Sequence, residues 1–246
     1  MGTLQKTQVI LTVEHGGHKI PAPYAPLFRG QSQVLKSHRG WDQGALVIAK
    51  VLQSKWGSPL VASTTSRLLI DLNRSLSHKS VFSEYTQDLQ PDTKDQIIAR
   101  YYAQYRAEVE DTVAKAYKRG ERVLHLSIHS FTPVWNHVRR KTDIGILFDP
   151  ARPGETNLAS YWQSLLRKDQ YFRDWAVHRN RPYQGKSDGF TTYLRTIFSG
   201  ESSKKQGEYL GIELEINQKF LKRENSARSI GREIARVLAL GEHHGT

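Results

Sequence analysis

The sequence predicts an α/β fold in one domain over residues 1–246, with a mostly parallel sheet covered by helices on both faces. Short runs of β-branched and aliphatic residues alternate with longer segments whose apolar residues recur every three or four positions. That alternation is typical of parallel strands joined by crossover helices. No internal repeat or low-complexity linker divides the chain, and its length suits one large α/β domain.

The first half of the chain contains three predicted strands and two predicted helices. Residues 8–14 are apolar and β-branched, and Gly16-Gly17 ends this strand with a turn. Residues 42–55 have helical apolar spacing and stop at a glycine and a proline. Residues 60–64 and 68–72 are predicted short strands. Residues 93–118 form the longest amphipathic segment, and Gly120 is expected to cap that helix.

The second half continues the same alternation. Strands are predicted at residues 122–129, 143–148 and 209–216, and helices at 155–169 and 218–240. Residues 179–192 are rich in Gly, Pro, Asn and Ser, and are predicted to form a loop. The polar tail 241–246, which contains His243 and His244, is expected to be disordered.

The composition restricts the chemistry. The chain has no cysteine, which excludes a disulfide framework, a thiol nucleophile and a thiolate-bound zinc. Any metal must therefore be held by His, Asp and Glu. A chain of this size can bury a core without a structural metal, so a metal site here is expected to be functional. The N-terminus has no signal-peptide pattern and no segment is long and apolar enough to cross a bilayer, which predicts a cytoplasmic protein.

The formal net charge is +12, with 36 Lys and Arg residues against 24 Asp and Glu residues. This excess is compatible with nucleic-acid binding, an anionic substrate or merely a solvated surface. The basic residues are spread along the chain, and their short runs are not interleaved with aromatic residues as a nucleic-acid platform requires. Nucleic acid is therefore not expected as a partner.

Two predicted strands end in histidine. Glu14-His15-Gly16-Gly17-His18 follows the first strand, and Ile128-His129-Ser130 ends a later one. Ligands of open α/β sheets bind beyond the carboxyl ends of strands, so these histidines are candidate ligands of a metal. Read alone, each is more typical of a solvated turn or of a hydrogen-bonded strand end.

Two further clusters contain charged residues. Glu213 and Glu215 lie two positions apart on a strand, so they share one face while their apolar neighbours point to the other. Two buried carboxylates are costly without a metal, a cation or a proton, which favours an active site. Asp71-Leu72-Asn73-Arg74, with Arg67 upstream, fits either a carboxylate-binding site or a structural Arg–Asp ion pair.

In this order the clusters resemble the N-formylglutamate amidohydrolase family, which looks related to zinc carboxypeptidases and aspartoacylases. The resemblance runs from residue 13 to 218 and implies an α/β/α sandwich around a mixed, mostly parallel sheet. The matching stretches are VEHGGHKIP (13–21), GWDQGAL (40–46), SRLLIDLNR (66–74), SIHSFTP (127–133), DIGILF (143–148), NRPYQGKSDGFTTYL (180–194) and GIELEINQ (211–218).

The resemblance implies one zinc ion per chain, with another divalent metal as an alternative. His15 and His129 would be ligands. Where the carboxypeptidase pattern has its carboxylate ligand, this chain has His18, so Asp42 is the first choice for the third ligand and His18 the second. Ser127 replaces an Asp that often supports the second histidine in related motifs.

The resemblance also implies roles for the other clusters. Glu215 would be the catalytic acid and base, with Glu213 as the fallback. Asn73 and Arg74 would hold a substrate carboxylate, with Arg67 nearby. The loop residues Asn180, Tyr183 and Thr192 would border the pocket, and Arg179 and Arg181 are candidates for a second substrate carboxylate.

The expected activity is therefore zinc-dependent hydrolysis of a small anionic N-formyl or N-acyl acidic amino acid, such as N-formylglutamate. One alternative is a zinc carboxypeptidase or deacylase with another acyl amino acid or peptide as substrate. A second alternative, from a different class, is a basic, non-enzymatic anion-binding protein that has kept the scaffold.

Overall fold

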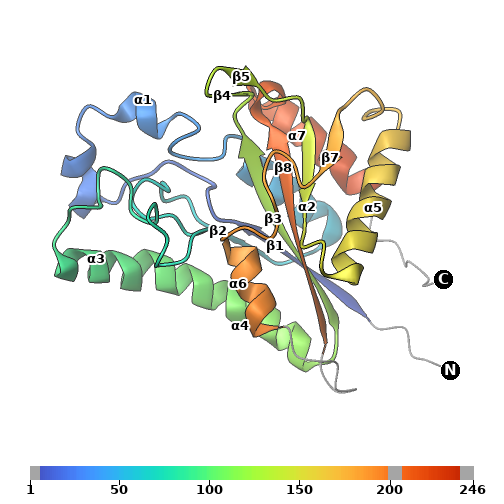
Figure 1. Cartoon of the computed structure of the whole chain (residues 1–246), viewed down its shortest axis with the longest axis horizontal. Coiled ribbons are helices and arrows are strands. Elements are labelled where there is room, and N and C mark those ends of the chain that lie inside the picture. Colours follow the sequence, from blue (N-terminus) through green and yellow to red (C-terminus); the bar gives the residue numbers. More distant parts are fainter. Residues whose placement is uncertain (1–5, 199–206, 239–246) are drawn as a thin grey trace.

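The computed structural model describes residues 6–198 and 207–238 and confirms the α/β fold (Figure 1). Six strands form the main sheet in the order β2–β1–β3–β8–β6–β7. Strands β2, β1, β3 and β8 are parallel, β6 is antiparallel to β8, and β7 is parallel to β6. The strands are β1 (Thr7–Val13), β2 (Leu60–Ala62), β3 (Arg122–Phe131), β6 (Ile144–Leu147), β7 (Val177–Arg179) and β8 (Glu208–Asn217).

Helices pack on both faces of this sheet. One face is covered by α2 (Ala45–Trp56), α5 (Pro153–Lys168) and α7 (Glu224–Val237). The other face is covered by α4 (Gln104–Lys118) and α6 (Phe190–Ile197). Each face has its own apolar core, and each fully buried Leu, Ile or Val side chain contributes about 1.5–3 kcal/mol of hydrophobic stabilisation.

The central strands place polar side chains on the face that α4 and α6 cover. On β8, Ile212, Leu214 and Ile216 point to the opposite core, so Glu213 and Glu215 point to the α4 side, as predicted. The strand register sets Ser127 of β3 beside Glu213, and His129 beside Glu215. Because β1, β3 and β8 are parallel, their polar carboxyl-terminal ends meet at one edge of the sheet.

The long helix predicted at 93–118 consists of three segments. These are α3 (Pro91–Ile97), a π-helical turn η2 (Ile98–Ala103) and α4. Helices α3 and α5 begin two residues earlier than predicted, each with a proline in its first turn. Proline is tolerated there because its missing N–H has no partner within the helix.

The predicted strand 68–72 is wrong. These residues form turns, in which the Leu69 N–H donates to the Ser66 carbonyl and the Asp71 N–H to the Val81 carbonyl. Leu69 and Ile70 are nevertheless buried in the core beneath α4. A short apolar run indicates burial but does not distinguish a strand from a packed loop.

Other boundaries also differ from the prediction. Residues 218–220 form a short 3₁₀ turn, η3 (Gln218–Phe220), before α7 begins. The predicted loop 179–192 contains the end of β7 and the start of α6, whose first residue Phe190 follows a glycine. Neither β7 nor α6 was predicted. The other elements that were not predicted are η1 (Ala22–Phe28), α1 (Ser32–Leu35), and the hairpin strands β4 (Val134–Trp135) and β5 (Val138–Arg139).

Residues 239–246, including His243 and His244, lie outside the described residues. Among the residues that the structure does describe, none of the helices has the length and apolar character needed to cross a membrane. The cytoplasmic location stays a prediction.

Candidate active site

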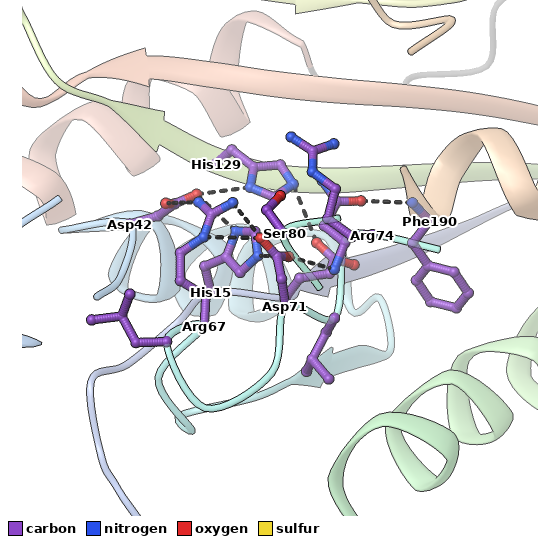
Figure 2. Close-up of polar contacts among 12 residues, drawn as sticks. His15, Asp42, Arg67, Asp71, Arg74, Ser80, His129 and Phe190 are labelled. Carbon is purple, nitrogen blue, oxygen red and sulfur yellow. Dashed lines mark hydrogen bonds and ion pairs between the residues drawn. The ribbon is translucent and has the colours of Figure 1, made fainter. Parts of the chain in front are cut away.

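Five of the predicted residues meet in one buried cluster at the carboxyl-terminal edge of the parallel strands (Figure 2). His15 lies in the turn that follows β1, His129 lies on β3, and loops bring Asp42, Arg67 and Asp71 beside them. The Asp42 loop is fixed against the end of β1, because the Asp42 N–H donates to the His15 carbonyl over 2.9 Å.

His15, Asp42 and His129 have the arrangement of a metal-binding group. Their ligand atoms all lie within 4.8 Å of one another, and all three residues are buried. Asp42 Oδ2 lies 2.7 Å from His129 Nδ1 and 3.5 Å from His15 Nδ1. His15 Nδ1 is buried and has no hydrogen-bond partner in the described part of the chain. A buried nitrogen lone pair beside a carboxylate and a second imidazole fits a divalent cation.

The Nε2 atom of each histidine ring contacts a carboxylate, and that of His129 also contacts a hydroxyl. His15 Nε2 lies 2.8 Å from Asp71 Oδ1. His129 Nε2 lies 2.9 Å from the Ser127 hydroxyl and 3.3 Å from Glu14 Oε2. The Ser127 hydroxyl donates its proton to Glu14 over 2.6 Å, so it accepts from the histidine. These contacts leave both Nδ1 atoms facing Asp42. In metal sites a carboxylate often holds the other ring nitrogen of a histidine ligand in this way.

Glu14 stands next to His15 in the first predicted cluster, but the sequence analysis gave it no role. It supplies the support for His129 that Ser127, standing where related motifs have Asp, cannot supply alone. Burial by itself raises the pKa of Glu14, but hydrogen bonds from His129 and Ser127 outweigh it and hold the pKa well below its usual range. The Tyr105 hydroxyl donates a further hydrogen bond to Oε1 over 3.0 Å.

The charge of the cluster also suits a cation. Burial opposes ionisation of Asp42 and Asp71, but their pKa values are lowered, chiefly by His15 for Asp42 and by Arg67 for Asp71. Arg67 donates to Asp71 over 2.7 and 3.2 Å and lies 3.5 Å from Asp42. The cluster contains three carboxylates, those of Glu14, Asp42 and Asp71, and the Arg67 guanidinium. When both histidines are neutral, these groups carry a net charge of two negative charges, which a divalent cation balances.

His18 does not join this group. Its half-buried ring lies 5.2 Å from the ring of Trp41, and it is not among the three residues whose ligand atoms converge. The tight turn expected at Gly16-Gly17 brings the backbone close to Ser63 and Thr64 instead: a Cβ on Gly17 would lie 2.5 Å from the Thr64 carbonyl. The glycines therefore serve close backbone packing, and the turn does not direct His18 to His15.

Glu213 and Glu215 lie in the wall of a cavity of about 720 Å³ that also reaches His15, Asp42 and His129. Both glutamates are buried. Burial raises the pKa of Glu213, and it raises the pKa of Glu215 to about 8. Glu215 Oε2 has no hydrogen-bond partner among the described residues. A carboxyl with a pKa of this kind can exchange a proton near neutral pH.

Asn73 and Arg74 lie on the same cavity. The Asn73 side-chain oxygen accepts from the Phe190 N–H over 2.6 Å, which leaves its amide hydrogens as donors. The Arg74 guanidinium donates to the Asp188 carbonyl. Its own backbone carbonyl accepts from Tyr102 and from the buried Arg106. The backbone is therefore anchored while the guanidinium points toward the cavity.

The loop residues fall into two groups. Tyr183 lines the cavity, whereas Asn180 and Thr192 are not among the residues that line it. The Asn180 side chain accepts from the Phe148 and Gly185 N–H groups, and Thr192 donates to the Ser187 carbonyl. Asn180 and Thr192 thus hold the shape of the loop. Their polar character alone could not distinguish this role from substrate contact.

The predicted second-carboxylate arginines also lie outside the cavity lining. Arg179 donates to the Ser160 hydroxyl over 2.6 Å on the exposed side of β7, and Arg181 is not a lining residue. Arg140, which was not among the predicted site residues, lines the cavity instead. A hairpin between β3 and β6 brings it there, and no strand or helix pattern signalled that fold-back.

Comparisons with known proteins show the family of the chain. The model of the N-formylglutamate amidohydrolase family matches residues 7–221. A gene product of Agrobacterium tumefaciens is 27% identical, with a TM-score of 0.80, over 96% of this chain and 90% of that one. An N-formylglutamate amidohydrolase of Ralstonia eutropha is 20% identical, with a TM-score of 0.63, over 95% and 92% of the two chains. A search of curated protein sequences gave no match.

The family match spans the end of β1, the loops that supply Asp42 and Asp71, and strands β3 and β8. The residues that line the cavity therefore lie within the matched region. This chain belongs to the N-formylglutamate amidohydrolase family.

Proposed function

We propose that the chain is a zinc-dependent amidohydrolase that cleaves the amide bond of an N-formyl or N-acyl acidic amino acid, such as N-formylglutamate. One observation carries the proposal: the cluster of His15, Asp42 and His129 opens onto the same cavity as Glu215, a buried carboxyl with a raised pKa. A metal-binding group beside a proton-exchanging carboxyl is one arrangement that hydrolyses an unactivated amide.

His15, Asp42 and His129 would hold the zinc ion. When bound, zinc polarises the amide carbonyl and acidifies a water molecule. Asp71 and Glu14 would keep the Nε2 protons on the two histidines, so that each Nδ1 lone pair stays available. In the absence of the metal, Asp42 and Glu14 raise the pKa of His129 despite its burial. A proton and a metal ion therefore compete for the same nitrogen.

Glu215 would accept the proton of the attacking water and deliver it to the leaving amine. Its unpartnered Oε2 and its raised pKa support this role, and Glu213 on the same face is the fallback. Arg74 and the Asn73 amide would bind the carboxylate of the amino acid, which positions the scissile bond before reaction. Arg67 would place a fixed positive charge near the developing oxyanion.

Metal analysis tests the proposal. Elemental analysis of the purified full chain should find about one zinc ion per molecule, and His129→Ala should lose it. Zinc-loaded protein should release formate from N-formylglutamate. If no metal binds even after zinc is supplied, the metallohydrolase proposal fails, and a basic anion-binding protein with salt-dependent polyanion binding becomes the better account.

One observation favours the related alternative, a deacylase or carboxypeptidase. The cavity of about 720 Å³ is of the size that encloses a drug-sized ligand, whereas N-formylglutamate has only about a dozen non-hydrogen atoms. A series of N-acylglutamates of increasing chain length separates the two: kcat/KM that falls beyond formyl supports deformylation, and kcat/KM that rises supports a deacylase.

A further inference from the structure

Arg140 is fixed at the base of the β4–β5 hairpin, at the rim of the cavity. The hairpin turns through Asn136 and His137, whose φ angles of 47° and 62° are the left-handed values that a two-residue turn requires. Val134 pairs with Arg139 and Trp135 with Val138. The Arg140 N–H then donates to the Pro133 carbonyl over 2.9 Å, which closes the hairpin and fixes the backbone of Arg140.

The Arg140 side chain is held by aromatic rings. Its guanidinium carbon lies 4.9 Å from the ring centre of Tyr183, and 5.5 Å from those of Phe131 and Trp135. Nη1 donates to the Tyr183 hydroxyl over 2.9 Å and to the Thr132 carbonyl over 3.5 Å. Rings hold a guanidinium in place without neutralising its charge.

The contacts of Arg140 leave one side of the guanidinium free. Both hydrogen bonds use Nη1, and within residues 6–198 and 207–238 neither Nε nor Nη2 donates to any group. The Nε–Nη2 edge is the pair of parallel donors that binds a carboxylate through both of its oxygens.

The four arginines of the cavity differ in their partners. Arg39 is paired with Glu84, and Arg67 is paired with Asp71 and Asp42. Neither Arg74 nor Arg140 has an ion pair with a carboxylate in the described part of the chain. The cavity therefore presents two uncompensated guanidinium groups, which matches a ligand that carries two carboxylates.

Tyr183, which contacts Arg140, lines the same cavity as Glu215. Burial and the nearby charge of Glu215 raise the pKa of the Tyr183 hydroxyl, while Arg140 opposes that rise. Arg140, Tyr183 and Glu215 all line the cavity that also reaches His15, Asp42 and His129. A substrate whose amide lies beside Glu215 therefore occupies the same cavity that Arg140 lines.

We infer that Arg140 and the Tyr183 hydroxyl form a second anion subsite, which binds the side-chain carboxylate of an N-acylated acidic amino acid. The inference rests on the proposed function, in which Arg74 binds the other carboxylate. Arg140 thus takes the role that the sequence analysis gave to Arg179 and Arg181, which lie outside the cavity lining. In this role Arg140 selects an acidic side chain over a neutral one.

The test removes one charge from the enzyme and one from the substrate. N-formylglutamate and N-formylglutamine have nearly the same shape and differ by the side-chain charge. Zinc-loaded wild type should prefer N-formylglutamate. Arg140→Gln should lower kcat/KM for N-formylglutamate by about 10- to 100-fold, mainly through KM, and change it less than about threefold for N-formylglutamine.

Arg139→Gln is the matched control, because Arg139 lies next in the chain, is exposed and does not line the cavity. It should keep the preference of the wild type. Arg140→Lys keeps the charge without the paired donors and should fall between wild type and Arg140→Gln. Equal losses on both substrates with Arg140→Gln would assign Arg140 a purely structural role and overturn the inference.

A binding measurement keeps this test separate from the proposed function. Calorimetry of N-formylglutamate and N-formylglutamine on the zinc-loaded Glu215→Gln protein needs no turnover. If adding Arg140→Gln abolishes the difference between the two affinities, the subsite is supported even if the wild type hydrolyses neither compound. An unchanged difference overturns the subsite, even if hydrolysis is demonstrated.

Discussion

Glu14 and Glu215 are two buried glutamates that flank His129, and their surroundings give them opposite properties. Glu14 Oε1 accepts from Tyr105, and Oε2 contacts Ser127 and His129. Glu215 is the register neighbour of His129 on β8, but its Oε2 has no partner among the described residues. The pKa of Glu14 is therefore held low, and burial raises the pKa of Glu215 to about 8.

Hydrogen-bond donors, and not burial alone, therefore decide whether a carboxyl in this site is charged. Glu14 is a fixed anion that serves His129, whereas Glu215 is suited to exchange a proton. A bound divalent cation would lower the pKa of Glu215 toward neutrality, which brings it closer to the working range of a general base.

The largest effect is expected from Glu215→Gln. Loss of the proton-exchanging group should lower kcat for N-formylglutamate by about 10²- to 10⁴-fold, while elemental analysis still finds zinc. Glu213→Gln on the same face is the control and should change kcat by less than about tenfold. Near-normal turnover of the Glu215 variant would remove it from the role of base; a larger loss with the Glu213 variant would move that role to Glu213.

His125 and His129 are two buried histidines whose surroundings shift their pKa values in opposite directions, which predicts a pH dependence of stability. His129 is bonded to carboxylates, and its pKa is raised; His125, equally buried, contacts Thr12 and Tyr209, and burial lowers its pKa to about 4. Between pH 6.5 and about 4 the unfolded state binds a proton at His125 that the folded state does not. The free energy of unfolding should therefore fall by up to about 3 kcal/mol as pH decreases through this window.

Urea unfolding of the zinc-free protein at several pH values measures this loss. Subtracting the values for His125→Gln isolates the contribution of His125 from other titrating groups. A variant with the same pH slope as the wild type between pH 6.5 and 4 would show that His125 is not the group responsible.

A smaller effect, on metal binding, is expected from Glu14→Gln. Without the charge that supports His129, zinc affinity should fall about 10- to 100-fold, measured by competition with a chelator. At saturating zinc, most of the turnover should return. Persistent inactivity in excess zinc would mean that Glu14 does more than support His129 and takes part in turnover itself.

The parts of the site that could be predicted from the sequence depend on local patterns. The period of two on β8 identified Glu213 and Glu215, and the strand ends identified His15 and His129. Asp42 came from the family resemblance, and the structure brings it to the two histidines. Whether these residues act as ligands and as a base stays a prediction.

The parts that could not be predicted depend on contacts between distant segments. Glu14 supports His129 only because β1 and β3 are adjacent, and Arg140 reaches the cavity only because a hairpin folds back. Asn180 was correctly placed in a loop, but only its contacts with Phe148 and Gly185 show that it braces the backbone. Periodicity carries no information about which segments become neighbours.

The hairpin that carries Arg140 belongs to no layer of the sandwich, since β4 and β5 pair only with each other. Its residues 134–139 are exposed, so they can be exchanged without disturbing either apolar core or the histidine cluster. If Arg140 selects the substrate side chain, exchanging these six residues and Arg140 would change which side chain is accepted. The proposed metal ligands and the proposed base lie outside the hairpin and would stay unchanged, so one scaffold could carry enzymes that accept different acyl amino acids.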